Sequence, residues 1–209
     1  MSIWTHFTTE TTCVAFDTET NGLFRQGKNN PRMVQLAWSI FSIDRGDIKK
    51  QSHLIRADDF DPNPSGNLKH GIDRARSLRE GIPPLEALER FRQDVIANGV
   101  KILVGHNIEF DIMVLKSECL VVRHNLSDVL GLPQFCTMKE MTGVLQIQND
   151  RNKHRYEARV SAYEESLDLR TRGAKRSLAR FEAYLSKELL TNKFKYPSLS
   201  EFNTVQLRF

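Results

Sequence analysis

The stretch VAFDTETNGL, residues 14–23, places two acids at the end of an apolar run. Because the side chains of a β-strand alternate between its two faces, Asp17 and Glu19 would stand side by side at the end of a largely buried strand. Close carboxylates repel each other and lose solvation on burial, so we expect something positive beside them. A turn at Asn21-Gly22 closes this strand, and any fold of the chain has to accommodate its charged end.

The size and composition of the chain predict one globular domain over residues 1–209. With 209 residues and 40% hydrophobic content, the chain can bury a sizeable core. No apolar run reaches the ~18 to 20 residues of a membrane span, and the start MSIWTHFTTETT does not resemble a signal peptide. Three cysteines without a CxxC pair suit reduced thiols, so we expect a cytoplasmic protein with neither a disulfide framework nor a zinc site.

The positive charge of the chain is concentrated in one late segment. The net charge is +4, but residues 150–195 alone hold 12 Lys and Arg against 7 Asp and Glu. Apolar residues three to four apart predict an amphipathic helix there: Leu178, Phe181, Leu185 and Leu189. Two interpretations stay open, namely a solvated helical hairpin with a mixed-charge face and a clamp that contacts a phosphate backbone.

The order of the expected elements predicts an α/β layered domain. Three strands come first and are followed by alternating helices and strands. The strands are expected at residues 13–20, 33–44, 52–59 and 101–104, the helices at 84–99 and 108–120, and loops at 63–66 and 105–107.

A third acid, Asp111, lies in the first turn of the second expected helix. Its apolar neighbours should pack inward: Ile112, Val114 and Leu115. Taken alone, an acid near a helix N-terminus is often only a partner of the helix dipole. Together with Asp17 and Glu19, however, it makes three carboxylates from two elements, which is a suitable site for hard divalent cations.

These motifs resemble those of a known family. FDTETNGL, followed some ninety residues later by VGHNIEFDIMVL, resembles the first and second motifs of the DnaQ-like 3′–5′ exonucleases. This DEDD superfamily includes polymerase proofreading domains of the polymerase III epsilon type. Three further segments resemble the family's HGI element, its CTM strand and its (W/Y)PKLSEL helix start: residues 69–72, 135–138 and 196–202. The resemblance implies a ribonuclease H-like layered fold, a mixed central sheet flanked by helices, with residues 150–195 as a basic helical insertion.

The resemblance also implies what compensates the paired acids. In that family two Mg²⁺ or Mn²⁺ ions lie among the acids; by analogy Asp17 bridges both ions, Glu19 binds the ion that carries the attacking water, and Asp111 holds the other. Two such ions, roughly 3.5 to 4 Å apart, can activate a water and stabilise the leaving oxygen of a phosphodiester. The implied activity is hydrolysis at the 3′ ends of nucleic acid, with DNA expected and no membrane partner.

Further residues are expected to contact the substrate. Leu23 is placed to wedge against a terminal base, as the matching Leu does in relatives. Phe110 could stack on a base, but packing under the site is favoured because buried Phe is commoner than exposed Phe. Asn107 either caps its helix or touches a backbone phosphate. The full expected set is Thr18, Gly22, Leu23, Ile72, Asn107 and Phe110.

One part of the family pattern does not appear. The third motif, H-x-A-x-x-D or Y-x-x-x-D, supplies a fourth ligand and the general base, but only NTVQLRF follows Phe202. His124 with Asp128, Tyr163 with Asp168, and His154 are disfavoured as substitutes by position or spacing. Three explanations stay open: a truncated copy with impaired activity, a last helix supplied by a partner chain or a second copy, or a catalytically inactive nucleic-acid-binding module.

Overall fold

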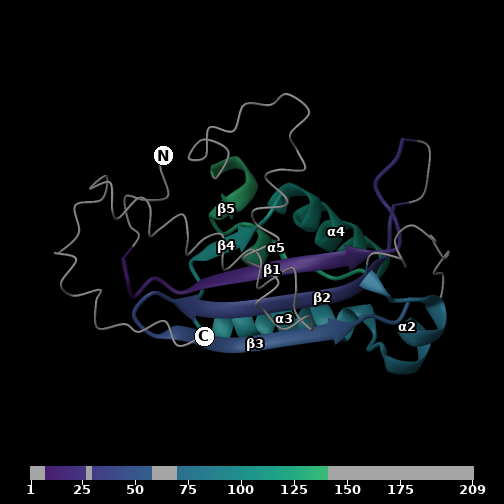
Figure 1. The fold of residues 1–209 in the computed structure, drawn as a ribbon, viewed down its shortest axis with the longest axis horizontal. Coiled ribbons are helices and arrows are strands. Elements are labelled where there is room, and N and C mark those ends of the chain that lie inside the picture. Colours follow the sequence, from purple (N-terminus) through teal and green to yellow (C-terminus); the bar gives the residue numbers. More distant parts are fainter. Residues whose placement is uncertain (1–7, 27–29, 58–69, 141–209) are drawn as a thin grey trace.

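The computed structural model describes residues 8–26, 30–57 and 70–140, in which a five-stranded sheet is flanked by helices (Figure 1). The strand order is β3-β2-β1-β4-β5. β2 is antiparallel to both β1 and β3, whereas β4 is parallel to both β1 and β5. The strands are β1 (Cys13–Thr20), β2 (Met33–Ser42), β3 (Gly46–Leu54), β4 (Ile102–Gly105) and β5 (Gln134–Cys136). The prediction of an α/β layered domain with a mixed sheet is confirmed.

The two central strands follow their predicted ranges closely. β1 has the predicted bounds, and β2 begins at Met33 as expected and ends two residues before the predicted Asp44. Both strands are almost completely buried, because most of their residues on both faces are apolar or small. β4 is displaced by one residue from its prediction. β5 contains the beginning of the CTM segment, and a helical segment begins at Thr137.

The third strand was predicted wrongly. It was expected at residues 52–59 but spans Gly46–Leu54, directly after the turn that follows β2. The strand lies at the edge of the sheet and is only partly buried, so its sequence GDIKKQSHL is polar and shows little apolar alternation. Ile55, which the prediction included, forms an isolated bridge with Ile82 instead.

The helices described over their whole length are α2 (Arg74–Glu80), α3 (Pro84–Ala97), α4 (Ile108–Val121) and α5 (Ser127–Leu130), and residues 137–140 are also helical. α2 was not predicted; it begins where the Asp73 side chain accepts a hydrogen bond from the Arg76 N–H, at 2.7 Å. α3 begins at a proline, as predicted, and Gly99 follows its end with a φ of +60°. α4 confirms the predicted helix and extends it by one residue.

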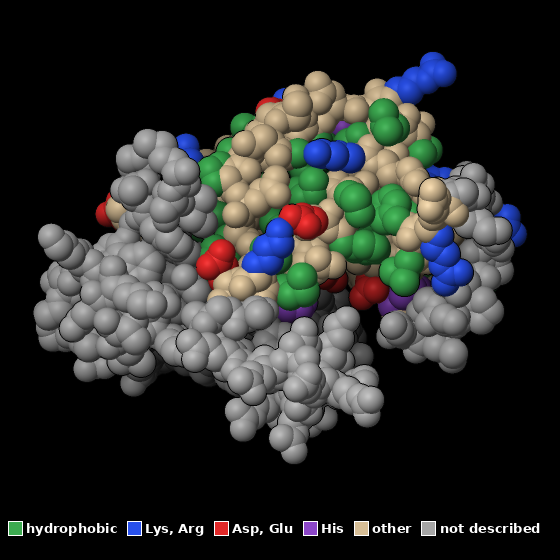
Figure 2. Space-filling model, turned by 90° about the horizontal axis from the view of Figure 1, so that it is seen from above, with side chains coloured by type: hydrophobic (Ala, Val, Ile, Leu, Met, Phe, Trp, Pro, Cys, Tyr) green, Lys and Arg blue, Asp and Glu red, His purple; other side chains and the backbone are tan. Residues whose placement is uncertain are grey.

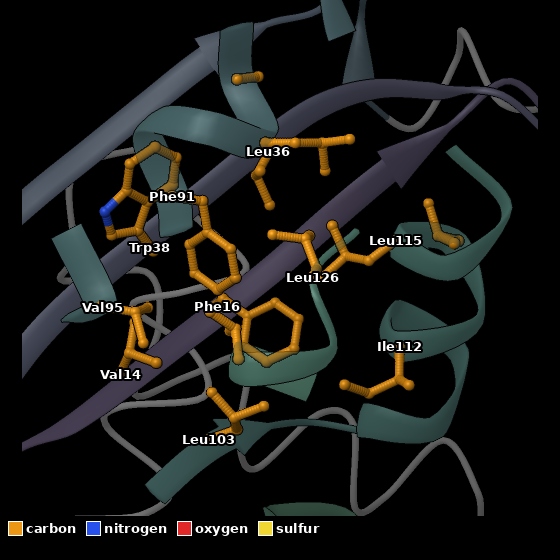
Figure 3. Close-up of a cluster of buried hydrophobic side chains, with 14 of the residues drawn as sticks. Val14, Phe16, Leu36, Trp38, Phe91, Val95, Leu103, Ile112, Leu115 and Leu126 are labelled. Carbon is orange, nitrogen blue, oxygen red and sulfur yellow. The ribbon is translucent and has the colours of Figure 1, made fainter. Parts of the chain in front are cut away.

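The hydrophobic core lies between one face of the sheet and helices α3, α4 and α5 (Figure 3). Phe16 of β1 and Trp38 of β2 both pack against Phe91 of α3, with ring centroids 5.5 and 5.4 Å apart. From α4, Ile112 and Leu115 enter the same cluster, as predicted. Truncating a buried Phe of this kind typically costs ~3–5 kcal/mol, so these contacts fix α3 and α4 on the sheet.

Helix α4 is also apolar on its outer side. Its exposed side chains include Leu120, which is 79% exposed, together with Met113 and Val121. Hydrophobic side chains likewise appear among the charged ones on the surface in Figure 2. Because both sides of α4 are apolar, hydrophobic periodicity does not identify its buried side. No helix within the described ranges is long and apolar enough to cross a membrane.

The three cysteines, Cys13, Cys119 and Cys136, are buried free thiols. Several predictions fall outside the described residues: the loop at 63–66, the insertion at 150–195 with Tyr163, Asp168 and His154, and the segment at 196–202.

Candidate metal and nucleic-acid site

The end of β1 projects beyond its parallel neighbour. The ladder between β1 and β4 ends at Ala15 and Val104, whereas β1 continues to Thr20. Strand alternation places Asp17 and Glu19 on one face of the sheet and Thr18 on the face that α3 and α4 cover. The predicted pair of acids thus lies on one strand end, at an edge that β4 does not occupy.

Asp111 reaches this edge from α4. A close turn brings the helix there: a Cβ on Gly105 would lie 2.9 Å from the Ile108 side chain, and Asn107 adopts the left-handed conformation with a φ of 62°. The Thr18 backbone N–H and the Thr18 hydroxyl both donate to Asp111 Oδ1, at 2.9 and 2.7 Å. The acid of the second motif therefore contacts the backbone between the two acids of the first.

The Asp111 carboxyl lies in an unfavourable electrostatic environment, since only 3% of the residue is exposed. Burial raises the pKa of Asp111 from 3.8 to about 7, the two Thr18 hydrogen bonds oppose this rise, and the negative charge of Glu19 adds to it. The influence of Glu19 indicates that these two acids are close enough to interact. A bound cation would lower this pKa by favouring the charged carboxylate.

A second acid of α4, Glu118, lies two helical turns after Asp111 and also contacts the sheet. Glu118 is completely buried and accepts two hydrogen bonds from the Arg32 guanidinium, at 2.9 and 3.1 Å. Its Oε1 also accepts from the backbone N–H of Met33, at 2.8 Å. Sequence patterns did not reveal this pair, although an acid inside an otherwise apolar helix was the available signal.

The loop after β1 is closed at its base by the same arginine. The Arg32 backbone N–H donates to the Asn21 side chain at 2.8 Å, and the Asn21 N–H donates to the Arg32 carbonyl at 3.1 Å. Inside this loop the Thr20 hydroxyl donates to the Gly22 carbonyl at 2.6 Å. Leu23 follows and is 63% exposed, so it is accessible to a nucleic-acid base.

Other expected substrate contacts occupy varied environments. Ile72 is 1% exposed and packs with Val34 and Ala57. Phe110 packs edge-on against Phe24, with centroids 5.7 Å apart, which agrees with the favoured packing interpretation. Asn107 occupies the N-cap position, but its side chain makes no capping hydrogen bond.

His70, in the predicted HGI element, lies beside the end of β1. Its Nδ1 accepts from the Ile72 N–H at 3.1 Å, so its Nε2 carries the proton and donates to the Thr20 carbonyl at 3.3 Å. His70 was not among the predicted site residues. The HGI element was the sequence signal that could have indicated it.

The disfavoured substitute pair lies against α3. His124 Nε2 is 3.3 Å from the Glu89 carboxylate, and Asp128 accepts from Arg92 at 2.8 Å. These contacts place both residues against α3, although His124 Nε2 is buried and has no hydrogen-bond partner among the described residues.

The side chains of Asp17, Glu19 and Asp111 are chemically suited to bind a divalent cation, because carboxylate oxygens are the ligands that hard cations prefer. The burial of Asp111 also favours a positive charge beside it. In the ranges 8–26, 30–57 and 70–140, however, no three His, Cys, Asp or Glu side chains form a group already arranged to hold an ion.

Comparison with known proteins gives similarity at the level of structure. No protein-family model and no curated protein sequence matches the chain. Among solved structures, exonuclease I from Methylocaldum szegediense has a TM-score of 0.54 at 19% identity and covers 63% of this chain. Escherichia coli exonuclease I in complex with a dA16 oligonucleotide has a TM-score of 0.51 at 18% identity, also over 63%. A product-bound exonuclease I has a TM-score of 0.69 at 15% identity, over 87%.

These similarities define the fold class. The chain spans 28%, 30% and 44% of those three proteins, respectively, so it corresponds to less than half of each. At identities below 20% the likeness establishes the architecture, which is the ribonuclease H-like layered fold of exonucleases. The fold predicted from the motifs is confirmed.

Proposed function

We propose that the chain is a DnaQ-like, metal-dependent 3′–5′ exonuclease, of the polymerase-proofreading type, that hydrolyses phosphodiester bonds at 3′ ends of DNA. The observation that carries the proposal is the contact of Asp111 with Thr18, which brings an acid of α4 to the β1 backbone between Asp17 and Glu19. The exonuclease fold and the motif order support the same function.

Each residue of the proposed site has its own expected role in this reaction. Asp17, Glu19 and Asp111 provide the oxygen donors for two Mg²⁺ or Mn²⁺ ions. When bound, such ions supply activation of the attacking water and stabilisation of the leaving 3′ oxygen. Leu23, held on a loop whose base is closed by Asn21 and Arg32, contacts the terminal base.

Thr18 and Gly22, at the end of β1 and in the loop that follows it, are two further expected substrate contacts. Among the described residues no general base or fourth acidic ligand can be assigned, because His124 and Asp128 contact α3. We propose that a partner chain, a second copy or another segment supplies these groups.

The test is release of mononucleotides from a 5′-labelled single-stranded DNA oligonucleotide, with Mn²⁺ or Mg²⁺ and with EDTA. Asp17→Asn should lower the rate by at least about 10³-fold, because a catalytic ion contributes several kcal/mol and each ~1.4 kcal/mol is tenfold. Glu86→Gln, which changes an exposed helix acid paired with Arg90, should leave the rate unchanged. Hydrolysis that survives Asp17→Asn in pure protein would refute this assignment.

A second candidate is a nucleic-acid-binding module without catalysis. It is favoured by the absence, among the described residues, of three acids already arranged around one ion. Such a module would bind the oligonucleotide without cutting it, with an affinity that falls as salt rises, because the 12 Lys and Arg of residues 150–195 would contact phosphates. Matched DNA and RNA oligonucleotides in the same titration test the preference for DNA.

A further inference from the structure

Thr18 lies between the two acids of β1 but faces the other way. Its side chain is directed to the face covered by α3 and α4, and the residue is buried. Its backbone is nevertheless shared with Asp17 and Glu19, since the three residues are consecutive members of one strand. A side chain that is hydrogen-bonded to Thr18 therefore has a fixed position relative to both acids.

Both Thr18 donors end on the same oxygen of Asp111. The backbone N–H and the hydroxyl approach Oδ1 at 2.9 and 2.7 Å, and an oxygen of a carboxylate has two lone pairs. Both lone pairs of Oδ1 thus accept a hydrogen bond from Thr18, whereas Thr18 donates to neither lone pair of Oδ2. A carboxylate held at one oxygen by two bonds loses the rotation that a single bond would allow.

We propose that Thr18 is a positioning residue: its hydroxyl holds Asp111 at the end of β1 so that Oδ2 is the oxygen left for a divalent cation. This inference rests on the proposed function. The donors suit the task because both are neutral. They orient the carboxylate and partly compensate its desolvation without cancelling the negative charge that an ion requires.

The hydroxyl can be separated experimentally from the rest of Thr18. Thr18→Val has nearly the same shape and retains the backbone N–H, so residue 18 would donate one hydrogen bond to Asp111 in place of two. Thr18→Ser restores a hydroxyl without the methyl group. If Thr18 acted only by filling space, Val would preserve the site better than Ser.

A matched control is available on β2. The buried Ser39 hydroxyl also donates to a carboxylate, that of Asp47 on β3, at 3.1 Å. Ser39→Ala therefore removes a bond of the same kind from the same sheet without touching Asp111.

The experiment is a Mn²⁺ titration of the full chain without nucleic acid, followed by the electron paramagnetic resonance signal of free Mn²⁺. Loss of a group that supports a metal ligand typically lowers metal affinity by about 10- to 100-fold, which we expect for Thr18→Val. Thr18→Ser and Ser39→Ala should bind as the wild type does. The rate of DNA hydrolysis by Thr18→Val should recover at saturating Mn²⁺. If Thr18→Val does not fold, Thr18→Ala makes the same test.

Three results would overturn the inference: wild-type Mn²⁺ affinity in the folded Val or Ala variant, equal weakening by Ser39→Ala, or no Mn²⁺ binding by the wild type. The proposed function fails by a different result, namely an absence of Asp17-dependent DNA hydrolysis. A protein that binds Mn²⁺ through Thr18-supported Asp111 but does not cut DNA would retain the inference and lose the function.

Discussion

Asp111 and Glu118 lie seven residues apart on α4, so both are directed toward the sheet. Both are buried, and each accepts a backbone N–H from a strand, that of Thr18 for Asp111 and that of Met33 for Glu118. Their other partners differ. Glu118 is held by the Arg32 guanidinium through two charge-assisted bonds, whereas Asp111 receives a neutral hydroxyl and lies near the negative charge of Glu19.

This difference separates a structural contact from a candidate functional one. The opposite charges of Arg32 and Glu118 neutralise each other, so this pair can join α4 to the start of β2. The pKa of Asp111 is raised, because the hydrogen bonds from Thr18 offset only part of the cost of burying its negative charge. A positive charge beside Asp111 would therefore stabilise the carboxylate. The Arg32–Glu118 pair attaches α4 to the sheet, whereas Asp111 is a candidate metal ligand that α4 presents at the end of β1.

The largest expected effect comes from breaking the structural pair. Glu118→Gln removes a charged partner of the Arg32 guanidinium, whose side chain is only 14% exposed, so the free energy of unfolding should fall by about 3–5 kcal/mol. Urea denaturation at pH 7 measures this loss.

A double variant sharpens the result. Arg32→Met combined with Glu118→Leu removes both charges and should recover most of the lost stability, because an apolar pair of similar volume often replaces a buried ion pair without cost. If Glu118→Gln were neutral, the pair would not be the attachment described above.

A smaller effect of opposite sign is expected for Asp111→Asn in EDTA. The folded-state pKa of Asp111 is about 7, against an ordinary value of 3.8, so folded protein binds this proton more tightly than unfolded protein does. The stabilising contribution is therefore fully present below pH 4 and is lost as pH rises through 7. Because a tenfold change in proton affinity corresponds to ~1.4 kcal/mol, the rise of the pKa from 3.8 to about 7 limits this contribution to the free energy of unfolding to about 4 kcal/mol.

The measurement is urea stability between pH 5 and pH 8 for wild type and variant. Relative to Asp111→Asn, the wild type should lose stability as pH rises, and added Mn²⁺ should reduce that loss. Parallel stability profiles would show that Asp111 does not titrate in this range.

The smallest effect concerns the entry to α4, on which both acids depend. Asn107 has a φ of 62°, so Asn107→Ala should lower stability by about 1 kcal/mol through left-handed strain. Asn107→Gly should remain close to wild type because glycine adopts this conformation freely. A lower oligonucleotide affinity in the stable Gly variant would instead support the predicted phosphate contact.

Much of the fold could be predicted because local signals and tertiary packing agree. β1, β2, α3 and α4 combine apolar patterns with clear boundaries, such as the proline before α3 and the turn after β4. β3 was predicted too late because an edge strand with residues such as Lys49 and Lys50 needs no apolar face. α2 was missed because its seven residues contain little that distinguishes a short capped helix from a loop.

The acids of the site were predicted, but not their supporting contacts. Asp17, Glu19 and Asp111 belong to motifs with characteristic order and spacing, whereas the partner of Asp111 depends on where β4 stops relative to β1. The pairing of Arg32 with Glu118 likewise depends on how α4 lies across the sheet. Such contacts depend on three-dimensional register, which a single sequence does not state.

The separation of these partners along the chain has a consequence for synthesis. Thr18 and Asp111 are 93 residues apart, and Arg32 and Glu118 are 86 apart. A ribosome adds about 5–20 residues per second, so the acids of β1 exist for roughly 5 to 20 seconds before Asp111 is made. The nascent chain can form the β1–β2–β3 meander during that interval, but the candidate site remains incomplete. Any cutting of nucleic acid by this chain must therefore begin only after α4 has emerged and docked.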